Sequence, residues 1–215
     1  MKSIAIKIIS AHKIYAKEKI EDLEEKRLVP KMMMRRRLTR NAKVMLYLSD
    51  KCGFEGGKIV YGTCFSELEE TAKIANAVLE NRLLSPTSFQ NSVYNTAPSY
   101  FSILNKDRDE IITISAGMKT SLETIKTAAL QALISKQRVL CVCVECINIK
   151  NIEEINNCTG YLESGAAIML EADEDISSAV EIENLKPSGI IDSLGDLMSV
   201  VKMYEDGKDK ILVEL

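Results

Sequence analysis

Apolar residues recur along the chain with two different periods, which predict alternating strands and helices. Residues 35–49 place Leu38, Ala42, Met45 and Leu46 at the i, i+4, i+7 and i+8 positions of a packed helix face. Residues 138–145 are apolar at nearly every position, as expected of a strand covered on both faces. The same criteria predict strands over 3–9, 58–62, 110–115, 138–145, 163–171, 178–183 and 210–215, and helices over 35–49, 67–82, 88–104, 122–135 and 192–204.

Local signals add detail between these segments. Residues 13–27 are highly charged and have only weak helical character. Thr63 or Ser66 could cap the helix 67–82, and residues 85–87 are typical of a turn. Pro98 predicts a break, or a restart, within 88–104. Acidic residues 173–175 are expected to form the turn that joins strands 163–171 and 178–183.

Strands that alternate with helices and end in a strand pair predict an α/β fold. We expect a mixed, mostly parallel central sheet with helices on both faces. The helix 122–135 should be buried at the centre, because its small side chains allow close packing; the relevant residues are Ala128, Ala129, Ala132 and Leu133.

Composition narrows the class of protein. The chain of 215 residues is 46% hydrophobic and 27% charged, which is typical of one globular domain spanning 1–215. Its apolar runs are far shorter than the ~20 residues that a membrane span needs. Lys7 interrupts the N-terminal apolar stretch, which argues against a secretory signal. We therefore expect a cytoplasmic protein with no membrane span.

The cysteines offer one possible metal site. Cys141, Cys143 and Cys146 are closely spaced, and Cys158 could be a fourth ligand. Two residues apart on a strand, the first two share a face ~6.5–7 Å apart, so both reach one metal only if the strand bends. The favoured interpretation is that these cysteines are small buried hydrophobes and that the chain binds no metal.

Basic residues are concentrated in one window of a chain whose net charge is −3. Residues 26–43 contain eight Lys or Arg residues and no acidic residue. These side chains could be a solvated helix start, or a docking surface for an acidic partner. Nucleic acid is disfavoured, because the rest of the chain is acidic and no aromatic platform accompanies the basic residues.

Three stretches in order carry a family resemblance: 31–40 (KMMMRRRLTR), 84–98 (LSPTSFQNSVYNTAP) and 111–120 (IITISAGMKT), followed by the strands 139–145 and 163–171. Together they resemble the N-terminal half of a β-ketoacyl synthase, most closely the short β-ketoacyl synthase-like N-terminal domain proteins. The resemblance is strongest over residues 30–172. It implies a thiolase-like fold, of which this chain is long enough for about one half.

The resemblance also locates the position of the nucleophile. In active synthases a cysteine lies at the turn where a strand meets a helix, and two histidines complete the chemistry. Gly117 or Met118 occupies that position here, and the chain has a single histidine, His12. Ser115 or Thr120 could substitute, but a strand-end hydroxyl and a helix cap are the favoured roles of these two residues, since no base is placed beside them. We expect neither condensing activity nor a cofactor.

The resemblance therefore implies a catalytically inactive protein of fatty-acid or aryl-polyene-type polyketide synthesis, which binds a partner synthase or an acyl carrier protein. The alternatives are an acyltransferase or hydrolase of acyl thioesters with a non-cysteine nucleophile, or one half-subunit of a split synthase. A dimer is expected, either with a second copy or with a complete ketosynthase, because strand 110–115 would otherwise leave an adhesive edge.

The basic window and the resemblance together give candidate site residues. The residues expected to dock a carrier protein or its phosphopantetheine phosphate are Arg35, Arg36, Arg37 and Arg40. At helical spacing, Arg36 and Arg40 would share a face and reach one anion. The residues expected to line an acyl pocket are Asn91, Asn95 and Thr120.

Overall fold

A seven-stranded sheet forms the centre of the computed structural model, which describes residues 3–147, 149, 160–175, 177–182, 185 and 191–214. The strand order is β3-β2-β4-β5-β1-β7-β6. The strands are β1 (Ser3–Ala16), β2 (Lys58–Gly62), β3 (Ile111–Ile114), β4 (Val139–Cys146), β5 (Glu163–Asp173), β6 (Val180–Glu181) and β7 (Lys210–Glu214).

The sheet is mixed, as expected. Of the six strand pairings among the described residues, β3–β2, β2–β4 and β6–β7 are parallel. The other three, β4–β5, β5–β1 and β1–β7, are antiparallel. Parallel pairs are therefore half of the sheet rather than most of it, because the N-terminal strand β1 lies antiparallel between β5 and β7.

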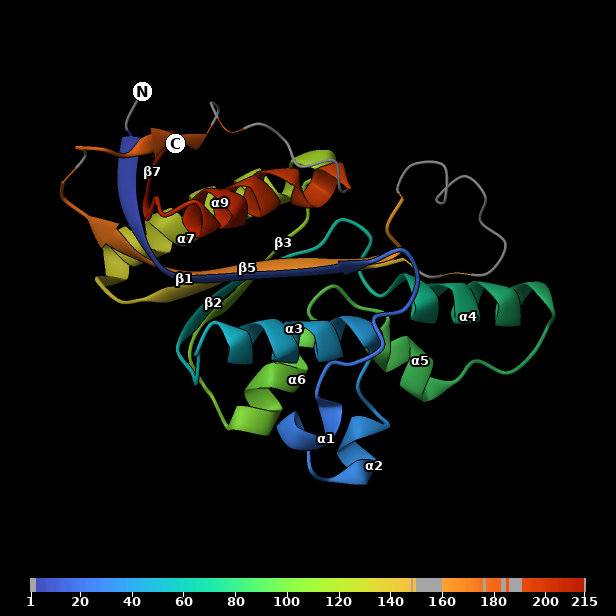
Figure 1. Ribbon diagram of the computed structural model, residues 1–215. Coiled ribbons are helices and arrows are strands. Elements are labelled where there is room, and N and C mark those ends of the chain that lie inside the picture. Colours follow the sequence, from blue (N-terminus) through green and yellow to red (C-terminus); the bar gives the residue numbers. More distant parts are fainter. Residues whose placement is uncertain are drawn as a thin grey trace.

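Helices cover both faces of the sheet, which confirms the expected fold class (Figure 1). On one face lie α7 (Thr120–Ser135) and α9 (Gly195–Glu205), and on the other α3 (Arg40–Lys51) and α6 (Thr96–Asn105). Each face encloses its own apolar core. The shorter helices α1 (Glu25–Leu28), α2 (Met32–Arg35) and α5 (Pro86–Asn91), with α4 (Leu68–Leu79), lie towards the α3 side (Figure 1).

Helix α7 packs against the sheet through small residues. Ala128, Ala129 and Ala132 are completely buried, as the sequence predicts. Leu133 was expected among them but is 48% exposed. The next residue in a helix is rotated by about 100°, so the position after a buried alanine points away from the sheet.

The helices and strands of residues 13–49 differ from those that the sequence predicts. Residues 13–16 continue β1, whose pairing with β5 extends to Ala16 opposite Glu163, and only α1 is helical in the predicted segment 13–27. The predicted helix 35–49 is split, because α2 ends at Arg35 and α3 begins at Arg40. Thr39 caps α3 by accepting a hydrogen bond from the Ala42 amide at 3.2 Å.

Three further local predictions meet different outcomes. The helix 88–104 is interrupted as expected, with Pro98 in the first turn of α6, where proline is tolerated. Ser85 caps α5 instead of forming a simple turn. Neither Thr63 nor Ser66 caps α4, because the Thr63 hydroxyl accepts from the Ser66 amide at 3.0 Å within the preceding loop.

The sequence predicts that strands 163–171 and 178–183 are neighbours joined by a turn, and this pairing is wrong. β6 is parallel to β7 and separated from β5 by β1 and β7. The free edge of β5 is instead taken by the much longer β1. No helix in the described ranges is both long enough and apolar enough to cross a membrane.

The close approach of α7 to the sheet depends on Gly62 at the end of β2. A Cβ atom there would lie 2.3 Å from the Thr124 Oγ1 and 2.6 Å from the Cys143 Sγ. We predict that Gly62→Ala lowers the free energy of unfolding by about 1–3 kcal/mol, the usual cost of overpacking. Urea denaturation measures this difference.

The matched control is Gly195→Ala, because a Cβ at Gly195 meets no atom within 4 Å. We expect no loss of stability in that variant. Equal stability of the two variants would show that the contact at Gly62 relaxes without cost.

Candidate functional site

The turn between β3 and α7 holds the position expected for a nucleophile. Gly117 has φ +60°, in the left-handed region that favours glycine, and opens the 3-10 turn η1 (Gly117–Lys119). A Cβ at Gly117 would meet no atom within 4 Å. Met118 is 52% exposed, so the turn opens directly onto the surface of this chain. Neither residue carries a group that attacks a thioester.

The nearby hydroxyl groups support the turn. Thr120 is buried; its Oγ1 accepts from the Ala116 amide at 3.0 Å and donates to the Gly117 carbonyl at 2.6 Å. Ser121 donates to the Asp196 Oδ2 at 3.0 Å and accepts from the Asp196 amide at 3.2 Å, which joins α7 to α9. Both hydroxyls are therefore engaged in structural hydrogen bonds.

His12 lies too far away to activate a nucleophile at this turn. It is on β1, four strand positions from β3 in the sheet. At about 4.8 Å per strand, the separation is roughly 19 Å. The His12 ring instead packs on Tyr47, with 5.8 Å between ring centroids. Partial burial, and after it the charge of Lys51, lower the pKa of His12.

A buried carboxylate fixes the strand ends beside the turn. Glu145, near the end of β4, is 1% exposed and accepts four hydrogen bonds. The donors are the Cys64 amide at 2.6 Å, and the Phe65 amide and the Thr63 and Ser193 hydroxyls at 3.1 Å each. Burial nevertheless raises the pKa of Glu145 to about 7. Sequence analysis missed this residue, although an acidic residue within an otherwise apolar strand signals a buried, partnered charge.

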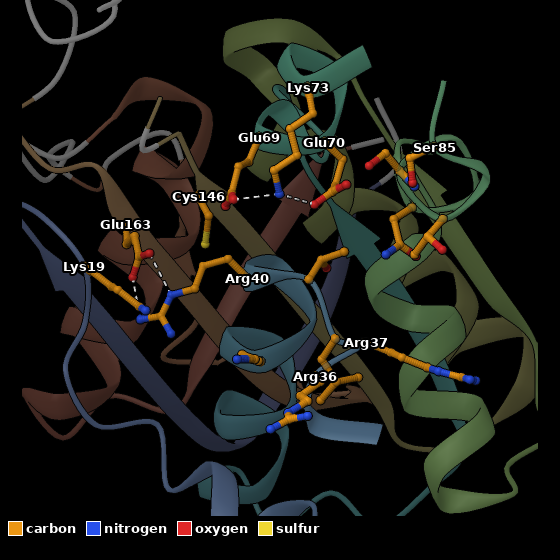
Figure 2. Close-up of a pocket in the computed structure, with 16 residues that line it drawn as sticks. Lys19, Arg36, Arg37, Arg40, Glu69, Glu70, Lys73, Ser85, Cys146 and Glu163 are labelled. Atoms are coloured by element: carbon orange, nitrogen blue, oxygen red, sulfur yellow. Dashed lines mark hydrogen bonds and ion pairs between the residues drawn. The ribbon is translucent and has the colours of Figure 1, made fainter. Parts of the chain in front are cut away.

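A second candidate region is a cavity of about 620 Å³ on the α3 side of the sheet (Figure 2). Six basic and three acidic side chains line it. The charged lining residues are Lys19, Arg36, Arg37, Arg40, Lys43, Lys73, Glu69, Glu70 and Glu163.

Arg40 is held by a buried ion pair in this cavity. Its Nε lies 2.7 Å from the Glu163 Oε1, and its Nη2 lies 2.7 Å from the Glu163 Oε2 (Figure 2). Arg40 also donates to the Ile20 carbonyl, while the Ile20 amide donates to Glu163 at 2.7 Å. The side chains are 11% and 2% exposed, so the pair joins α3 and the segment after β1 to β5.

The four arginines of the predicted docking surface thus have different environments. Arg35 donates to the Val29 and Pro30 carbonyls at 2.7 and 2.6 Å. Arg36 and Arg37 are exposed, and their side chains form no hydrogen bond or ion pair with the residues that the structure describes. The expectation that Arg36 and Arg40 share a helix face is wrong, because Arg36 follows α2 whereas Arg40 begins α3.

The predicted acyl-pocket residues do not gather at one cavity. Asn91 and Asn95 line a hollow of about 250 Å³ beside α6. The Asn91 Oδ1 accepts from the Tyr100 hydroxyl at 3.0 Å. Thr120 lies on the α7 face of the sheet, away from both asparagines (Figure 1).

The described cysteines are free thiols. Burial raises the pKa of Cys143 to about 12, and raises that of Cys141 well above its usual value. Both therefore favour the thiol over the thiolate that a metal requires. Within the described ranges no group of three His, Cys, Asp or Glu side chains could hold a metal ion. Cys158, the fourth residue of the predicted cluster, lies outside the described residues.

Comparison with known proteins identifies the family. The sequence model of the family called β-ketoacyl synthase, N-terminal domain, matches residues 11–189. The chain belongs to this family. The match confirms the resemblance seen in the sequence and extends it on both sides of 30–172.

Several solved structures share this fold. A structure described as a ketosynthase (ApeO) in complex with its chain length factor (ApeC) from Xenorhabdus doucetiae superposes with TM-score 0.62 at 22% identity, over 79% of this chain and 80% of that chain. The structure of the ishigamide ketosynthase/chain length factor superposes with TM-score 0.57 at 15% identity, over 73% of this chain and 49% of that chain.

A β-ketoacyl synthase from Burkholderia phymatum STM815 gives TM-score 0.50 at 14% identity, over 67% of this chain and 45% of that chain. The chain therefore spans about half the length of the latter two proteins. No curated protein matches the sequence. At these identities the likeness shows the fold, and it agrees with the thiolase-like half expected from the sequence.

The Arg40–Glu163 pair yields a stability prediction. Arg40→Met leaves a buried carboxylate without its cation, so we expect the free energy of unfolding to fall by about 3–5 kcal/mol. Arg36→Met removes an exposed, unpaired charge and should change the free energy of unfolding by less than about 0.5 kcal/mol. Urea denaturation of both variants checks the difference. Similar stabilities would mean that the pair contributes little.

Glu145 yields a prediction about pH. Its pKa is raised from 4.5 to about 7 in the folded chain, so the folded state holds the proton more tightly than the unfolded state. The contribution of Glu145 to the free energy of unfolding should therefore be greatest below pH 4.5. It should fall by about 3 kcal/mol as pH rises to 7. Glu145→Gln should reduce the slope of unfolding free energy against pH.

Some slope should remain, because burial also raises the pKa of Glu67 to about 8. The control is Glu174→Gln, an exposed residue whose removal should leave the slope unchanged. An identical pH dependence in the Glu145→Gln variant would refute the assignment.

Proposed function

We propose that this chain is a non-condensing ketosynthase-like subunit that associates with a complete ketosynthase in polyketide-type or fatty-acid synthesis. The observation that carries the proposal is the turn between β3 and α7, where Gly117 and Met118 stand in place of a nucleophile. The single histidine of the chain lies on a distant strand. The chain retains the family's fold but lacks the groups that condensation requires.

The compared structures support a partner of this kind. Two of them are described as pairs of a ketosynthase with a chain length factor. In the first, the matched chain is about as long as this one, since the alignment covers 79% and 80% of the two chains. A chain of similar length and fold thus occurs in a structure that contains a ketosynthase, and we extend that arrangement to this chain.

An uncovered apolar face on α7 also favours association. Leu130, Leu133 and Ile134, at i, i+3 and i+4 of the helix, are 38%, 48% and 68% exposed. Clustered exposed apolar side chains mark interaction surfaces. In a full-length synthase of this fold, the second half would supply the missing cover, and here a partner would do so.

The edge of the sheet gives a second contact surface. β3 pairs only with β2 within the described residues, and the Glu110 and Ile114 carbonyls face β2, so the unpaired backbone groups of the other edge belong to Ile111 and Thr113. Soluble proteins seldom leave such an edge free. Pairing of β3 with a second subunit would extend the sheet across a dimer.

An acyl carrier protein that docks on the basic residues of 26–43 would contact Arg36 and Arg37. Arg35 and Arg40 are engaged in internal hydrogen bonds, whereas Arg36 and Arg37 keep their guanidinium groups free of described partners. An acidic carrier would offer carboxylates or a phosphate to these groups.

The alternative function, an acyltransferase or hydrolase with a hydroxyl nucleophile, is less favoured. The Thr120 hydroxyl is already engaged in hydrogen bonds within the turn.

The proposal predicts association through α7 without catalysis by this chain. The purified chain should neither decarboxylate nor condense malonyl-carrier protein, and it should co-purify with the ketosynthase of its native cell. Leu133→Asp with Ile134→Asp should weaken that association at least about tenfold, because two charges would be buried in an apolar contact. Sedimentation of the mixed proteins measures it.

The control is Met33→Asp, since Met33 is 71% exposed on α2, away from α7. Condensation by the chain alone, or a ketosynthase that binds both variants equally, would contradict the proposal.

A further inference from the structure

Residues 68–90, here called the arm, comprise α4, most of α5 and the connection between them. In Figure 1 the arm lies beyond the ends of the strands, with α4 beside α5. Of its residues, all of which the structure describes, only Ala77 is buried. Within the described part of the chain, the arm's side chains form hydrogen bonds and ion pairs only with residues 67–90. The arm is therefore attached to the rest of the chain mainly at its two ends.

The C-terminal end of the arm is anchored on α6. Asn91 is buried, and its Oδ1 accepts from the Tyr100 hydroxyl at 3.0 Å. The Asn91 carbonyl accepts from the Thr96 hydroxyl at 3.1 Å. Neither bond involves a group that titrates near neutral pH, so this anchor should not respond to pH there.

The N-terminal end of the arm is attached to α3 by two hydrogen bonds. The Thr39 hydroxyl donates to the Glu67 Oε1 at 2.7 Å, and the Asn41 Nδ2 donates to the Ser66 carbonyl at 2.7 Å. Ser66 has φ +56°, which is uncommon for a residue other than glycine. The Asn41 Oδ1 and the Ser66 Oγ are buried without a hydrogen-bond partner among the described residues. A strained junction with unpaired polar atoms opens more easily than one that is fully hydrogen-bonded.

The cavity of about 620 Å³ lies between the arm and α3. Glu69, Glu70 and Lys73 line it from the arm, and Arg36 and Arg40 line it from the other side. Figure 2 shows Glu69 and Lys73 on the opposite side of the cavity from Arg36. A change in the angle of the arm at its junction with α3 would therefore change the width of the cavity.

Glu67, at this junction, is a buried carboxyl group without a counterion. It is 6% exposed and forms no ion pair within the described residues. The charged side chain nearest to Thr39 in sequence on α3, Arg40, is bound to Glu163. Lys73 pairs with Glu69 and Glu70. The titratable groups that interact electrostatically with Glu67 are Glu69 and Glu70 of α4, Tyr61 of β2, Cys146 of β4 and Tyr100 of α6, and none of them is a cation.

This environment favours the neutral form of Glu67. Burial, with smaller contributions from Glu70 and Glu69, raises its pKa to about 8 against the opposing effect of the Thr39 hydrogen bond. The N-terminus of α3 also favours the anion, but a helix terminus offsets only part of the cost of burying an unpaired charge. A hydrated Glu67 would keep its ordinary pKa of 4.5. The closed junction is therefore favoured most below about pH 4.5 and loses this advantage as the pH rises to about 8.

We propose that the arm is a pH-sensitive lid of the cavity: neutral Glu67 holds it closed through Thr39, and ionisation of Glu67 releases it from α3. The ionised carboxylate would turn towards water, and Ser66 and the start of α4 would move with it. The inference goes beyond the proposed function, because it requires neither a ketosynthase nor a carrier protein. The junction lies on the α3 side of the sheet, away from the α7 surface, so either proposal can fail while the other stands (Figure 1).

The test is a distance measurement by double electron–electron resonance on the purified full chain. Spin labels on unnatural amino acids at Asn76 in α4 and Asn105 at the end of α6 leave the native cysteines intact; both positions are exposed. At about pH 5.5 we expect one short distance, and at about pH 8.5 an additional longer one. The opening equilibrium constant should rise about tenfold per pH unit between about pH 4.5 and 8. Labels at Glu55 and Asn105, both outside the arm, should show no change.

Two variants assign the response to Glu67. Glu67→Gln keeps the size and the hydrogen-bond acceptor of the neutral acid but cannot ionise, so the arm should stay closed at both pH values. Glu69→Gln removes a carboxylate that is 55% exposed on the same helix, and the response should remain. Circular dichroism at both pH values verifies that each variant is folded.

Identical distances at the two pH values in the unmodified chain would overturn the proposal. A response that survives in Glu67→Gln, or that disappears in Glu69→Gln, would also overturn it.

Thr39 is tested separately. Thr39→Val removes the hydroxyl donor and should open the arm even at about pH 5.5, whereas Thr39→Ser keeps the hydroxyl and should leave the arm closed. A closed arm in Thr39→Val would contradict the role of this hydrogen bond, and with it the proposed lid.

Discussion

The structure depends on the complete burial of β4. All eight residues of this strand are buried, so both faces of the sheet must be covered at the same position along the chain. Helix α7 covers one face and α3 the other, and their two apolar cores meet only through the sheet. Burial of apolar surface on both sides is the main source of stability for such a strand.

Burial of β4 and β5 forces their polar ends to find partners. Glu145 is satisfied by four donors from the β2–α4 loop and η3 (Asp192–Leu194), and Glu163 by Arg40 and the Ile20 amide. A buried charge without such partners would cost several kcal/mol. The two carboxylates thus fix the loops at the strand ends, beside the turn of Gly117 and beside the basic cavity.

The turn between β3 and α7 holds Gly117 and Met118, neither of which carries a nucleophilic side chain. Thr120 and Ser121 use their hydroxyls to hold the turn and to join α7 to α9. The exposed side of α7 is apolar, with Leu130, Leu133 and Ile134 at the surface. Packing determines this fold, whereas a few side chains determine which chemistry the fold can carry.

The sequence by itself determined the elements whose pattern is local. The continuous apolar run of β4, the small-residue face of α7 and the alternation of strands and helices require no knowledge of distant contacts. That Gly117 and Met118 carry no nucleophilic side chain is likewise evident from the sequence alone.

Tertiary structure decided what depends on partners far apart in sequence. Residues 13–16 begin the charged segment 13–27, for which weak helical character is predicted, yet they continue β1 because β5 offers a long antiparallel edge. β6 joins β7 because β1 already occupies that edge. Arg40 looks like its neighbour Arg36 in the sequence, but Glu163, 123 residues away, draws only Arg40 into the interior. Only the fold separates a structural charge from one that is free to bind.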